Sequence, residues 1–429
     1  MKRLILFMVV ALLLSGCSNS NSGNQQCSIA EQNSVWFSYL QDWYLFYQDL
    51  PSEIDPNSYA SVAAMLEAVR SSQDRFSYII TKQDYDAFFN SGSYFGYGFS
   101  LDTEQVADAY VIRYVFSGSG ADNAGLQRGD QLISINGYSV TEIKQQSLDS
   151  ATVYGPDQDG YTISVTYRDA QSNTITTDIV KGVVTTNTVF DVRSFNTSAG
   201  TVGYLSFQHG FIEPSENELS SAFATLSADN PEQLILDLRY NGGGRISIAQ
   251  QLASLIGGDN TAGEVFGTLT FNDKHTNENS TYSFVSLLDD LNITRLIVLT
   301  TDNTCSASEM VINGLMPFLD VVVVGGTTCG KPIGMSPQEY CEMVMSAINF
   351  KVTNANDYGE YFDGLTAQCS VADQIVADWG SLDDPLLAEG IYFAENSSCS
   401  NVVRPELLSR SLQSQELPTY QSILFGNRY

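Results

Sequence analysis

Histidine is scarce in this sequence, whose 429 residues include only His209 and His275. Histidine is the usual general base for a serine or cysteine nucleophile and a common ligand of zinc. Neither histidine has an acidic partner at a recognisable spacing, so we interpret both as structural or solvated residues. The sequence also contains no CxxC pair. We therefore expect no metal site and no cofactor, and any hydrolytic chemistry must use another base.

Basic residues are few as well. The chain has 20 Lys and Arg against 49 Asp and Glu, which gives a formal net charge of -29. Such a field repels the phosphates of nucleic acids and anionic lipid surfaces. We therefore exclude nucleic acid as a partner and attribute the acidity to solubility outside the cytoplasm.

Long apolar runs are missing, apart from one at the start of the chain. Two basic residues precede an apolar run over 4–14, which is too short to cross a bilayer and is typical of a signal peptide. The run ends in Leu-Ser-Gly-Cys at 14–17, which resembles the lipobox of bacterial lipoproteins. We predict a lipoprotein signal peptide over 1–17, a lipid anchor on Cys17 and a polar tether over 18–33. The alternative is an ordinary secretory signal that leaves Cys17 as a free thiol.

The lipobox resemblance also implies a location. The residue after the cysteine is Ser18 and not an aspartate. This resembles the signal that directs lipoproteins to the outer membrane. We expect a protein of the cell envelope that is anchored to a membrane, on its periplasmic face, without spanning it.

Cysteine usage agrees with an oxidising compartment. Without Cys17, an even set of six remains, for which 15 disulfide connectivities exist. These six are Cys27, Cys305, Cys329, Cys341, Cys369 and Cys399. The spacing alone does not select among the connectivities.

Hydrophobic periodicity divides the remaining chain into three parts. Aromatic and aliphatic residues recur at spacings of three and four over 34–90, which predicts a small N-terminal helical module. Glycines and alternating strand patterns over 91–182 predict a β-rich domain. Apolar strands alternate with helical stretches over 183–429, which predicts an α/β domain with a largely buried sheet. The tail from Arg404 carries no clear pattern.

The β-rich part resembles a PDZ domain. Ala-Gly-Leu at 124–126, Gly-Asp at 129–130 and Ile-Ser-Ile-Asn-Gly at 133–137 stand in the order of that family. The resemblance implies a loop whose backbone N–H groups bind the carboxyl end of a peptide, and that loop would be Tyr97, Gly98, Phe99 and Ser100. The alternative is a β-rich spacer that binds nothing.

Three nucleophile candidates lie together in "DNTCSASEMVINGLM", which places Cys305, Ser306 and Ser308 at the start of a predicted helix. With histidine excluded, the base has to be a lysine whose pKa is lowered by burial. Lys331 is the candidate because it follows the apolar strand "DVVVVGG" and a turn. An ordinary loop lysine is the alternative.

The run Ser-Ala-Ser-Glu at 306–309 and the turn Gly-Lys at 330–331 resemble the active site of the carboxyl-terminal processing (tail-specific) proteases. The serine and the lysine are 25 positions apart here, as in that family. Further segments stand in family order, among them "DRFSYI" at 74–79 and "LDLRYNGGG" at 236–244. The resemblance implies a multidomain α/β protein with a peptidase core related to the ClpP/crotonase fold.

The resemblance also assigns roles. It makes Ser306 the nucleophile and Lys331 the general base, and leaves Ser308 and Glu309 to support the start of the helix. The oxyanion hole would combine the N–H of Ala307 with that of Gly243 or Gly244. The implied activity is that of a serine endopeptidase whose partners are polypeptides, bound through their carboxyl ends.

One position departs from the family pattern. Many members carry a glutamine four residues after the lysine, where this chain has Met335. A thioether is a poor partner for an ammonium group, so we expect either that another group such as Gln338 orients Lys331 or that activity is reduced. A peptide-binding scaffold with weak or no catalysis is the alternative function.

Two disulfides are expected from the placement of the cysteines around this site. Cys305 precedes the candidate nucleophile and Cys329 lies just before the candidate base, so a bond between them would join the two turns. Cys369 and Cys399, both near the carboxyl end, form the other expected pair.

Overall fold

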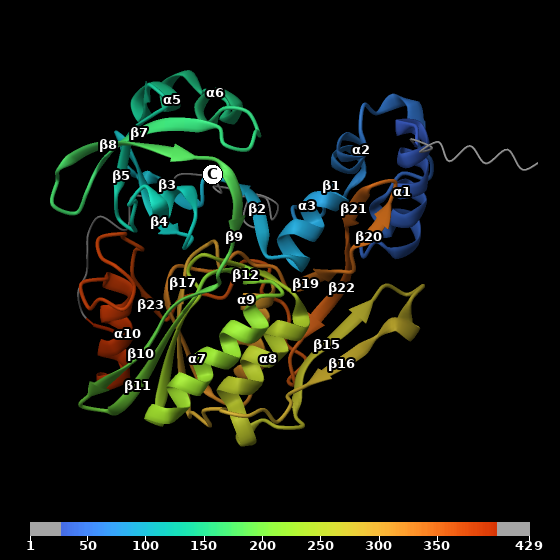
Figure 1. The fold of residues 1–429 in the computed structure, drawn as a ribbon. Helices are drawn as coiled ribbons and strands as arrows, with labels where there is room; N and C mark the ends of the chain where they lie inside the picture. The colour runs from blue at the N-terminus through green and yellow to red at the C-terminus, as the bar shows by residue number, and fades with distance from the viewer. Residues whose placement is uncertain (1–26, 401–429) are drawn as a thin grey trace, which may run out of the picture.

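A computed structural model describes residues 27–400. The predicted signal peptide, the lipidation site at Cys17, most of the predicted tether and the tail from Arg404 lie outside the described residues. The described chain forms three units, shown in Figure 1: the N-terminal module (27–90), the β-rich domain (91–185) and the core domain (186–400). The predicted multidomain α/β architecture is confirmed.

The core domain is built on a six-stranded sheet with the order β10-β11-β13-β17-β18-β23. β10 runs antiparallel to β11, and all other neighbours are parallel. Because the sheet is covered on both faces, its central strands are continuous apolar runs. Its strands are β10 (Val189–Thr197), β11 (Gly200–Phe207), β13 (Gln233–Asp237), β17 (Arg295–Thr300), β18 (Asp320–Gly325) and β23 (Cys369–Ser370).

Helices cover the two faces of this sheet unequally. Three helices cover one face of the sheet and form the largest apolar cluster together with it. The helix α10 covers the opposite face, where a separate cluster lies. The three are α7 (Ser215–Asp229), α8 (Ile246–Gly257) and α9 (Ala307–Leu315), and the fourth is α10 (Pro385–Asn396). None of the helices within residues 27–400 is long and apolar enough to cross a membrane.

A second layer of short sheets lies beside the core sheet. A four-stranded sheet has the order β16-β15-β22-β19, a three-stranded sheet has the order β1-β21-β20, and β12 pairs with β14. These strands are β1 (Tyr78–Thr81), β12 (His209–Phe211), β14 (Asn241–Gly244), β15 (Val265–Phe271), β16 (Ser280–Ser283), β19 (Ile333–Met335), β20 (Gln338–Tyr340), β21 (Met343–Ser346) and β22 (Ile348–Thr353).

The N-terminal module differs from the prediction in two ways. Its first helix begins at Ile29 rather than at 34, because the Ser28 side chain accepts the N–H of Glu31 at 3.2 Å and caps the helix there. The module is also not purely helical, since β1 pairs antiparallel with β21 of the core domain. Its helices are α1 (Ile29–Trp43), α2 (Val62–Val69), α3 (Lys82–Tyr85) and a π-helix (Asp86–Asn90), with 3₁₀ turns at Tyr47–Asp49 and Pro56–Ser58.

The β-rich domain is a five-strand path with the order β3-β4-β5-β7-β8 and short helices against it. The chain enters and leaves through a two-stranded ribbon, in which β2 pairs antiparallel with β9. The elements are β2 (Ser93–Gly96), β3 (Phe99–Val106), β4 (Ala109–Val115), α4 (Gly120–Asn123), β5 (Gln131–Ile135), β6 (Tyr138–Ser139), α5 (Val140–Gln146), α6 (Ser150–Tyr154), β7 (Thr162–Arg168), β8 (Thr174–Val180) and β9 (Gly182–Thr185).

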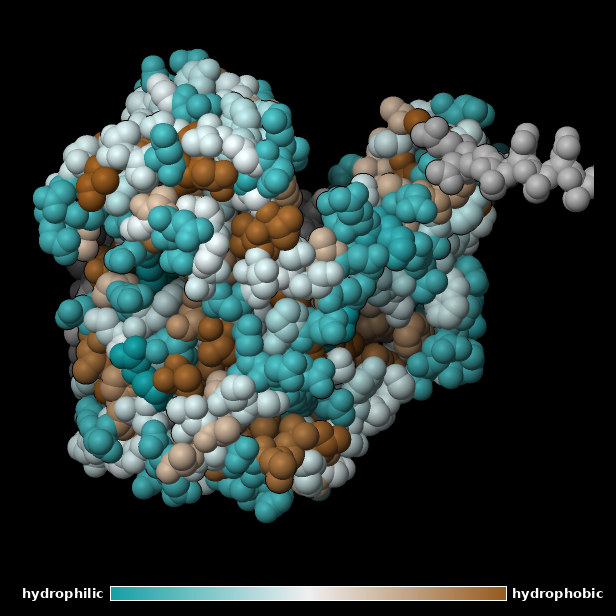
Figure 2. All heavy atoms as spheres, viewed as in Figure 1, coloured by the Kyte–Doolittle hydropathy of each residue, from teal (hydrophilic) through white to brown (hydrophobic). Residues whose placement is uncertain are grey.

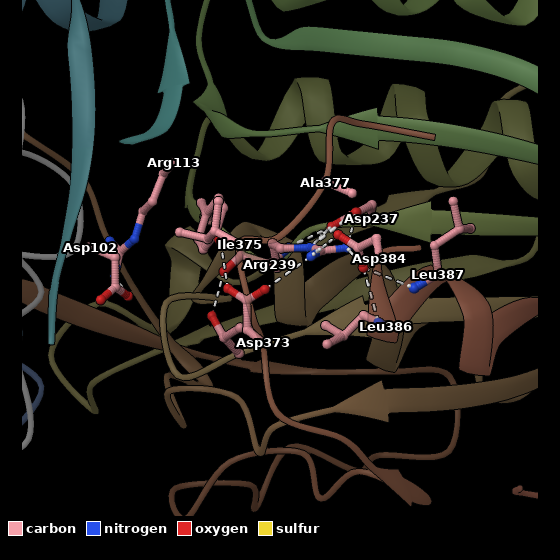
Figure 3. Close-up of polar contacts among 12 residues, drawn as sticks. Asp102, Arg113, Asp237, Arg239, Asp373, Ile375, Ala377, Asp384, Leu386 and Leu387 are labelled. Atoms are coloured by element: carbon pink, nitrogen blue, oxygen red, sulfur yellow. Dashed lines mark hydrogen bonds and ion pairs between the residues drawn. The ribbon is translucent and has the colours of Figure 1, made fainter. Parts of the chain in front are cut away.

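A buried arginine ties the end of β13 to the start of α10. The Arg239 guanidinium is fully buried and donates to Asp237, Asp373 and Asp384, with N···O distances of 2.8–3.1 Å (Figure 3). These carboxylates raise its pKa well above the ordinary value, against the opposing effect of burial. From the β-rich domain, the Arg128 guanidinium lies 3.9 Å from the centroid of the Trp379 ring, which attaches that domain to the same region.

Candidate active site

Ser306 occupies a sharp turn between β17 and α9. Its φ of +58° lies in the left-handed region, which a residue with a Cβ rarely adopts and which costs roughly 1–3 kcal/mol. Two hydrogen bonds hold this turn: Ser306 N–H donates to Glu309 Oε2 at 2.9 Å, and Cys305 N–H donates to the Asn241 carbonyl at 3.1 Å. The strained backbone directs the hydroxyl toward a cavity in front of the amino end of α9.

Lys331 lies opposite this hydroxyl. Its Nζ is 3.4 Å from Ser306 Oγ, and the side chain is 3% exposed. Burial lowers the pKa of Lys331 to about 7, while the Asp74 and Glu309 carboxylates act in the opposite direction. An amine with this pKa is neutral in a large fraction of molecules at pH 7, so it can accept the proton of the serine hydroxyl.

The pKa of Lys331 predicts how activity depends on pH. Because the neutral amine is the competent form, kcat/KM should rise as pH increases through about 7 and level off above pH 8. Hydrolysis rates of a fluorogenic peptide between pH 5 and pH 9 measure this. A rate that is flat across this range, or that falls with increasing pH, contradicts the assignment of Lys331 as the base.

Glu309 joins the nucleophile turn to the lysine turn. Its buried carboxylate accepts the N–H groups of Ser306, Gly330 and Lys331 at 2.8–2.9 Å and the hydroxyl of Thr328 at 2.5 Å. Burial raises the pKa of Glu309, and these donors oppose the rise. The residue therefore does more than support the helix start, since it fixes both catalytic candidates to one group.

Met335 lies beside the lysine amine. Its Sδ is 3.8 Å from Lys331 Nζ, and the ring centroid of Phe76 is 5.9 Å from the same atom. Gln338, the polar substitute considered above, is exposed on β20 in register with Met345. The ring face and the thioether compensate the ammonium only weakly for its lost water, so burial still disfavours the charged form, in agreement with the lowered pKa.

The two candidate glycines of the oxyanion hole have different surroundings. Gly243 N–H donates to Asn241 Oδ1 at 3.0 Å, so this donor is engaged within its own turn. A Cβ on Gly243 would lie 2.8 Å from Ser306 Cβ and 2.9 Å from Ala307 N, so only glycine fits there. Gly244 and Ala307 both line the cavity with Ser306. We therefore retain Ala307 and Gly244 as the candidate donors and assign Gly243 to the close approach of the two turns.

The N-terminal module supplies part of the site, which the sequence analysis missed. Asp74 accepts the Tyr44 hydroxyl at 2.7 Å and the Phe76 N–H at 2.9 Å, which fixes its carboxylate near the lysine. The Arg75 guanidinium donates to the carbonyl of Cys329, and Tyr78 lines the cavity. The segment "DRFSYI" was the available signal, but its position far from the Ser/Lys pair gave no reason to assign it a role in the site.

The cavity has a volume of about 430 Å³ and a mostly apolar wall. This wall is built by the hairpin of β15 and β16 together with α9, β19, β22 and Tyr361. Its apolar residues next to the candidate nucleophile suit the side chain of a bound polypeptide. They are Leu269, Phe271, Tyr282, Met310, Ile333, Phe350, Val352 and Tyr361.

Both expected disulfides are confirmed. Cys305 is bonded to Cys329 across a Cα–Cα distance of 5.2 Å, and Cys369 is bonded to Cys399. A third disulfide, for which no pairing was predicted, joins Cys27 to Cys341 and fastens the start of the N-terminal module to the turn between β20 and β21. Cys305 is therefore excluded as a nucleophile while this bond is intact.

The disulfide at the site should contribute to stability and to the geometry of the two turns. Replacing Cys305 and Cys329 together with alanine removes a link between residues 24 positions apart, which should lower the free energy of unfolding by about 3 kcal/mol. Urea unfolding at pH 7.5 measures this loss of stability. Cys369→Ala/Cys399→Ala, which removes the disulfide outside the site, is the matched control for the effect on kcat. Because Glu309 still joins the turns, we expect partial rather than complete loss of kcat. Unchanged stability of the first double variant would contradict the expectation.

The other predicted site residues lie elsewhere. Tyr97 and Phe99 are fully buried in the β-rich domain, and the Tyr97 hydroxyl donates to the Tyr154 carbonyl at 2.8 Å. Gly98 has a φ of +96°, its carbonyl accepts the Phe116 N–H, and Ser100 follows in β3. The Ala121 N–H of α4 also donates to the Tyr97 carbonyl at 2.9 Å. This loop is thus tied to α6 and α4, and its role in peptide binding stays a prediction.

The two histidines are separate from the active-site cavity. His209 is buried in β12 between the rings of Phe88 and Phe116. His275 stacks on Trp43 at 3.5 Å, and its Nε2 lies 3.2 Å from Asp42 Oδ1. Neither of them is among the residues that line the cavity.

Three family models match the chain. Residues 200–361 match peptidase family S41, residues 31–78 match the peptidase S41 N-terminal domain, and residues 89–154 match the PDZ domain. The matched ranges contain Ser306 and Lys331 in the first model and most of the predicted peptide-binding domain in the third.

Curated relatives are proteases with the expected name. The carboxyl-terminal-processing protease of Picosynechococcus sp. is 25% identical over 297 residues, which cover 68% of this chain and 68% of that protein. The carboxy-terminal processing protease CtpA of Bacillus subtilis is 25% identical over 279 residues, which cover 63% of this chain and 55% of that protein. The chain therefore spans little more than half of the second relative.

Solved structures share the fold. A crystal structure reported as an S41 protease from Bacteroides fragilis superposes with a TM-score of 0.70 at 24% identity, covering 85% of this chain and 97% of that one. The photosystem II D1 C-terminal processing protease gives a TM-score of 0.51 at 17% identity, covering 84% and 96%. At these identities the likeness concerns the fold.

Proposed function

Since this chain is a member of peptidase family S41 and carries that family's N-terminal domain together with a PDZ domain, we propose that it is an endopeptidase that cleaves polypeptides with Ser306 as nucleophile and Lys331 as general base. The observation that carries this proposal is the distance of 3.4 Å between Lys331 Nζ and Ser306 Oγ at a buried position. A lysine placed there loses its proton near neutral pH and has the serine hydroxyl within reach.

The reaction proceeds in two steps. Lys331 Nζ takes the proton of Ser306 Oγ while the oxygen bonds to the substrate carbonyl carbon, and the N–H groups of Ala307 and Gly244 stabilise the oxyanion that forms. The C–N bond then breaks, and the lysine ammonium returns the proton to the leaving amine. Lys331 Nζ then takes a proton from a water molecule, which attacks the acyl ester, and the lysine returns the proton to Ser306 Oγ as the product is released.

We further propose that the protein is lipid-anchored through Cys17 in the cell envelope, on the periplasmic face of the outer membrane. The lipobox at 14–17 and the three disulfides of the described chain support this location. Within it, the β-rich domain would recognise or gate the carboxyl ends of substrates through the loop at 97–100. Growth with labelled palmitate, comparing the wild type with Cys17→Ala, tests the anchor.

A catalytically weak scaffold is the second candidate function, and Met335 is the observation that favours it. The two candidates differ in one assay: purified protein is incubated with an unfolded polypeptide, and fragments are identified by mass spectrometry. The endopeptidase predicts internal cleavages that are absent from Ser306→Ala protein purified in the same way. Binding without fragments would establish the scaffold instead.

A further inference from the structure

Arg245 is a cation in the wall of the active-site cavity, and no step of the mechanism above uses it. It directly follows Gly244, the candidate oxyanion donor, and lines the cavity with it. Two residues earlier, Gly243 comes so close to the nucleophile that an added Cβ would lie 2.8 Å from Ser306 Cβ. Because consecutive Cα atoms are about 3.8 Å apart, Arg245 Cα lies within about 8 Å of Gly243 Cα. Arg245 therefore stands beside the place where the cleaved bond must lie.

The charge of Arg245 is not matched by a carboxylate. Seven other arginines within residues 27–400 form ion pairs with an aspartate or a glutamate. In this part of the chain Arg245 forms no ion pair, and its Nη2 donates to Asn90 Oδ1 instead. The Asn90 amide in turn donates at 2.6 Å to Asp86, whose carboxylate is paired with Lys82 Nζ at 2.7 Å. A neutral amide thus positions the guanidinium, and its positive charge remains available to a ligand.

Tyr85 brings a second donor to the same place. Burial raises the pKa of the Tyr85 hydroxyl, and the positive charge of Arg245 opposes this rise, so the two groups are close enough to interact. Both residues line the cavity. The Tyr85 ring packs on Phe89 with 4.8 Å between the ring centroids, which holds it against the wall. Guanidinium N–H groups and a phenol O–H together suit the oxygens of an anion.

The other charged residues of the cavity do not take this role. Lys331 is the base and loses its proton near pH 7. Glu278 is the carboxylate among the described lining residues; it is exposed in the 3₁₀ turn Thr276–Glu278 of the β15–β16 hairpin and accepts the Asn277 amide at 2.8 Å. Figure 2 shows hydrophobic spheres recessed between the N-terminal module and this hairpin, with hydrophilic spheres at the rim. An apolar wall strengthens the attraction between a cation and a bound anion.

From these observations we infer that Arg245, with the Tyr85 hydroxyl beside it, is a specificity-determining residue that binds a carboxylate of the polypeptide substrate close to the cleaved bond. An extended chain rises about 3.3 Å per residue, so the carboxylate belongs to a residue within about three positions of that bond. It is either an aspartate or glutamate side chain or the terminal carboxylate. The inference rests on the proposed function and concerns a site separate from the predicted loop at 97–100.

Matched peptides test this role. Cleavage sites are mapped in β-casein, an unfolded polypeptide, and peptides around one site carry glutamate, glutamine or lysine at single positions within three residues of the cut, with both ends blocked. For the wild type we expect kcat/KM to be roughly tenfold higher with glutamate than with glutamine at the best position. In Arg245→Gln this ratio should approach one, and in Arg245→Glu the lysine peptide should become the better substrate. Arg168→Gln, which removes a partly exposed arginine of the β-rich domain, is the matched control and should keep the wild-type ratio.

Asn90→Asp distinguishes substrate binding from a structural tie between the N-terminal module and the core domain. This variant keeps Arg245 and gives its guanidinium a carboxylate in place of the amide oxygen. If the arginine binds substrate, the glutamate/glutamine ratio falls although the arginine is present. A ratio near one in the wild type, or a wild-type ratio that persists in Arg245→Gln or in Asn90→Asp, overturns the inference. Each result is a ratio for one enzyme, so a general loss of activity does not change it.

A further pair of peptides identifies the source of the carboxylate. A peptide whose only carboxylate is its carboxyl end is compared with its amide. A preference for the acid that disappears in Arg245→Gln assigns the terminal carboxylate as the ligand, whereas a dependence seen only with internal glutamate assigns a side chain. Both results support the carboxylate site, and cleavage that depends on Arg245 with neither set of peptides overturns it while the proposed activity stands.

A binding arm separates the inference from the proposed function. Fluorescence anisotropy measures the affinities of labelled Ala/Leu decapeptides with a central glutamate or glutamine, which require no mapped site. Ser306→Ala should bind the glutamate peptide several-fold more tightly, and Ser306→Ala/Arg245→Gln should bind both equally. If the wild type cleaves nothing but this difference is found, the proposed activity fails and the carboxylate site stands. Equal affinities of both peptides for Ser306→Ala overturn the inference.

Discussion

Replacing either member of the Ser306/Lys331 pair should lower kcat by roughly 10⁴-fold or more, and replacing both should cost little more than replacing one. The reason is that the two side chains act as a unit: the hydroxyl is a weak nucleophile without the amine 3.4 Å away, and the amine has nothing to deprotonate without the hydroxyl. Rates of Ser306→Ala, Lys331→Met and the double variant on one peptide measure this.

The controls separate lost chemistry from lost folding. Burial lowers the pKa of Lys331 to about 7 in the folded chain, so at pH 6 the folded state holds an ammonium group that it disfavours relative to the unfolded state. Lys331→Met removes this cost. The variant should therefore unfold at the same or a higher urea concentration than the wild type at pH 6. Lys351→Met and Ser221→Ala change exposed residues and should keep full activity. Lys331→Arg should be inactive, since a guanidinium does not lose its proton near neutral pH. Strong residual activity in Lys331→Met would exclude the lysine as the base.

The approach of Ser306 to Lys331 was predictable because it depends on neighbouring elements. β17 and β18 are adjacent parallel strands, so the turns that follow them lie at the same edge of the sheet. The apolar strands, the helix that starts at Ala307 and the fixed spacing of the pair were all visible locally. The disulfide between Cys305 and Cys329 follows from the same geometry.

The contribution of the N-terminal module was not predictable in the same way. Asp74 and Tyr78 reach the site because β1 pairs with β21, and Tyr78 is in register with Ser346. Such long-range pairing is decided by packing of the whole molecule and leaves little trace in a local pattern. The bond between Cys27 and Cys341 belongs to the same contact, which is why spacing alone did not reveal it.

The orientation of the lysine also comes from a group whose importance the sequence understated. The absence of the glutamine concerns the amine end of the Lys331 side chain. Glu309 instead holds the backbone of the lysine turn, because its carboxylate accepts the N–H groups of Gly330 and Lys331. A carboxylate that accepts donors from both turns keeps their spacing, while the thioether of Met335 and the ring of Phe76 lie beside the amine.

Replacement of Glu309 should therefore be the most damaging change outside the catalytic pair. Glu309→Ala leaves three buried N–H groups without their acceptor, and we expect the free energy of unfolding to fall by about 3–5 kcal/mol. Glu309→Gln should cost less. Its carbonyl can still accept from Ser306 and Lys331, and its NH₂ can donate to the Thr328 oxygen, so only the Gly330 N–H and the Thr328 hydroxyl proton lose their acceptor. Urea unfolding measures both, with Glu264→Ala as an exposed control.

A pH profile distinguishes positioning of the base from stability alone. The Glu309 carboxylate raises the pKa of Lys331 against the larger effect of burial. Removing its charge in Glu309→Gln should therefore move the acid limb of the activity profile to lower pH than in the wild type, while kcat falls because the turns are less well held. A variant that loses stability but keeps the wild-type midpoint would reduce Glu309 to a structural residue. A midpoint shifted upward would contradict the electrostatic role, because removal of a nearby anion can only favour the neutral amine.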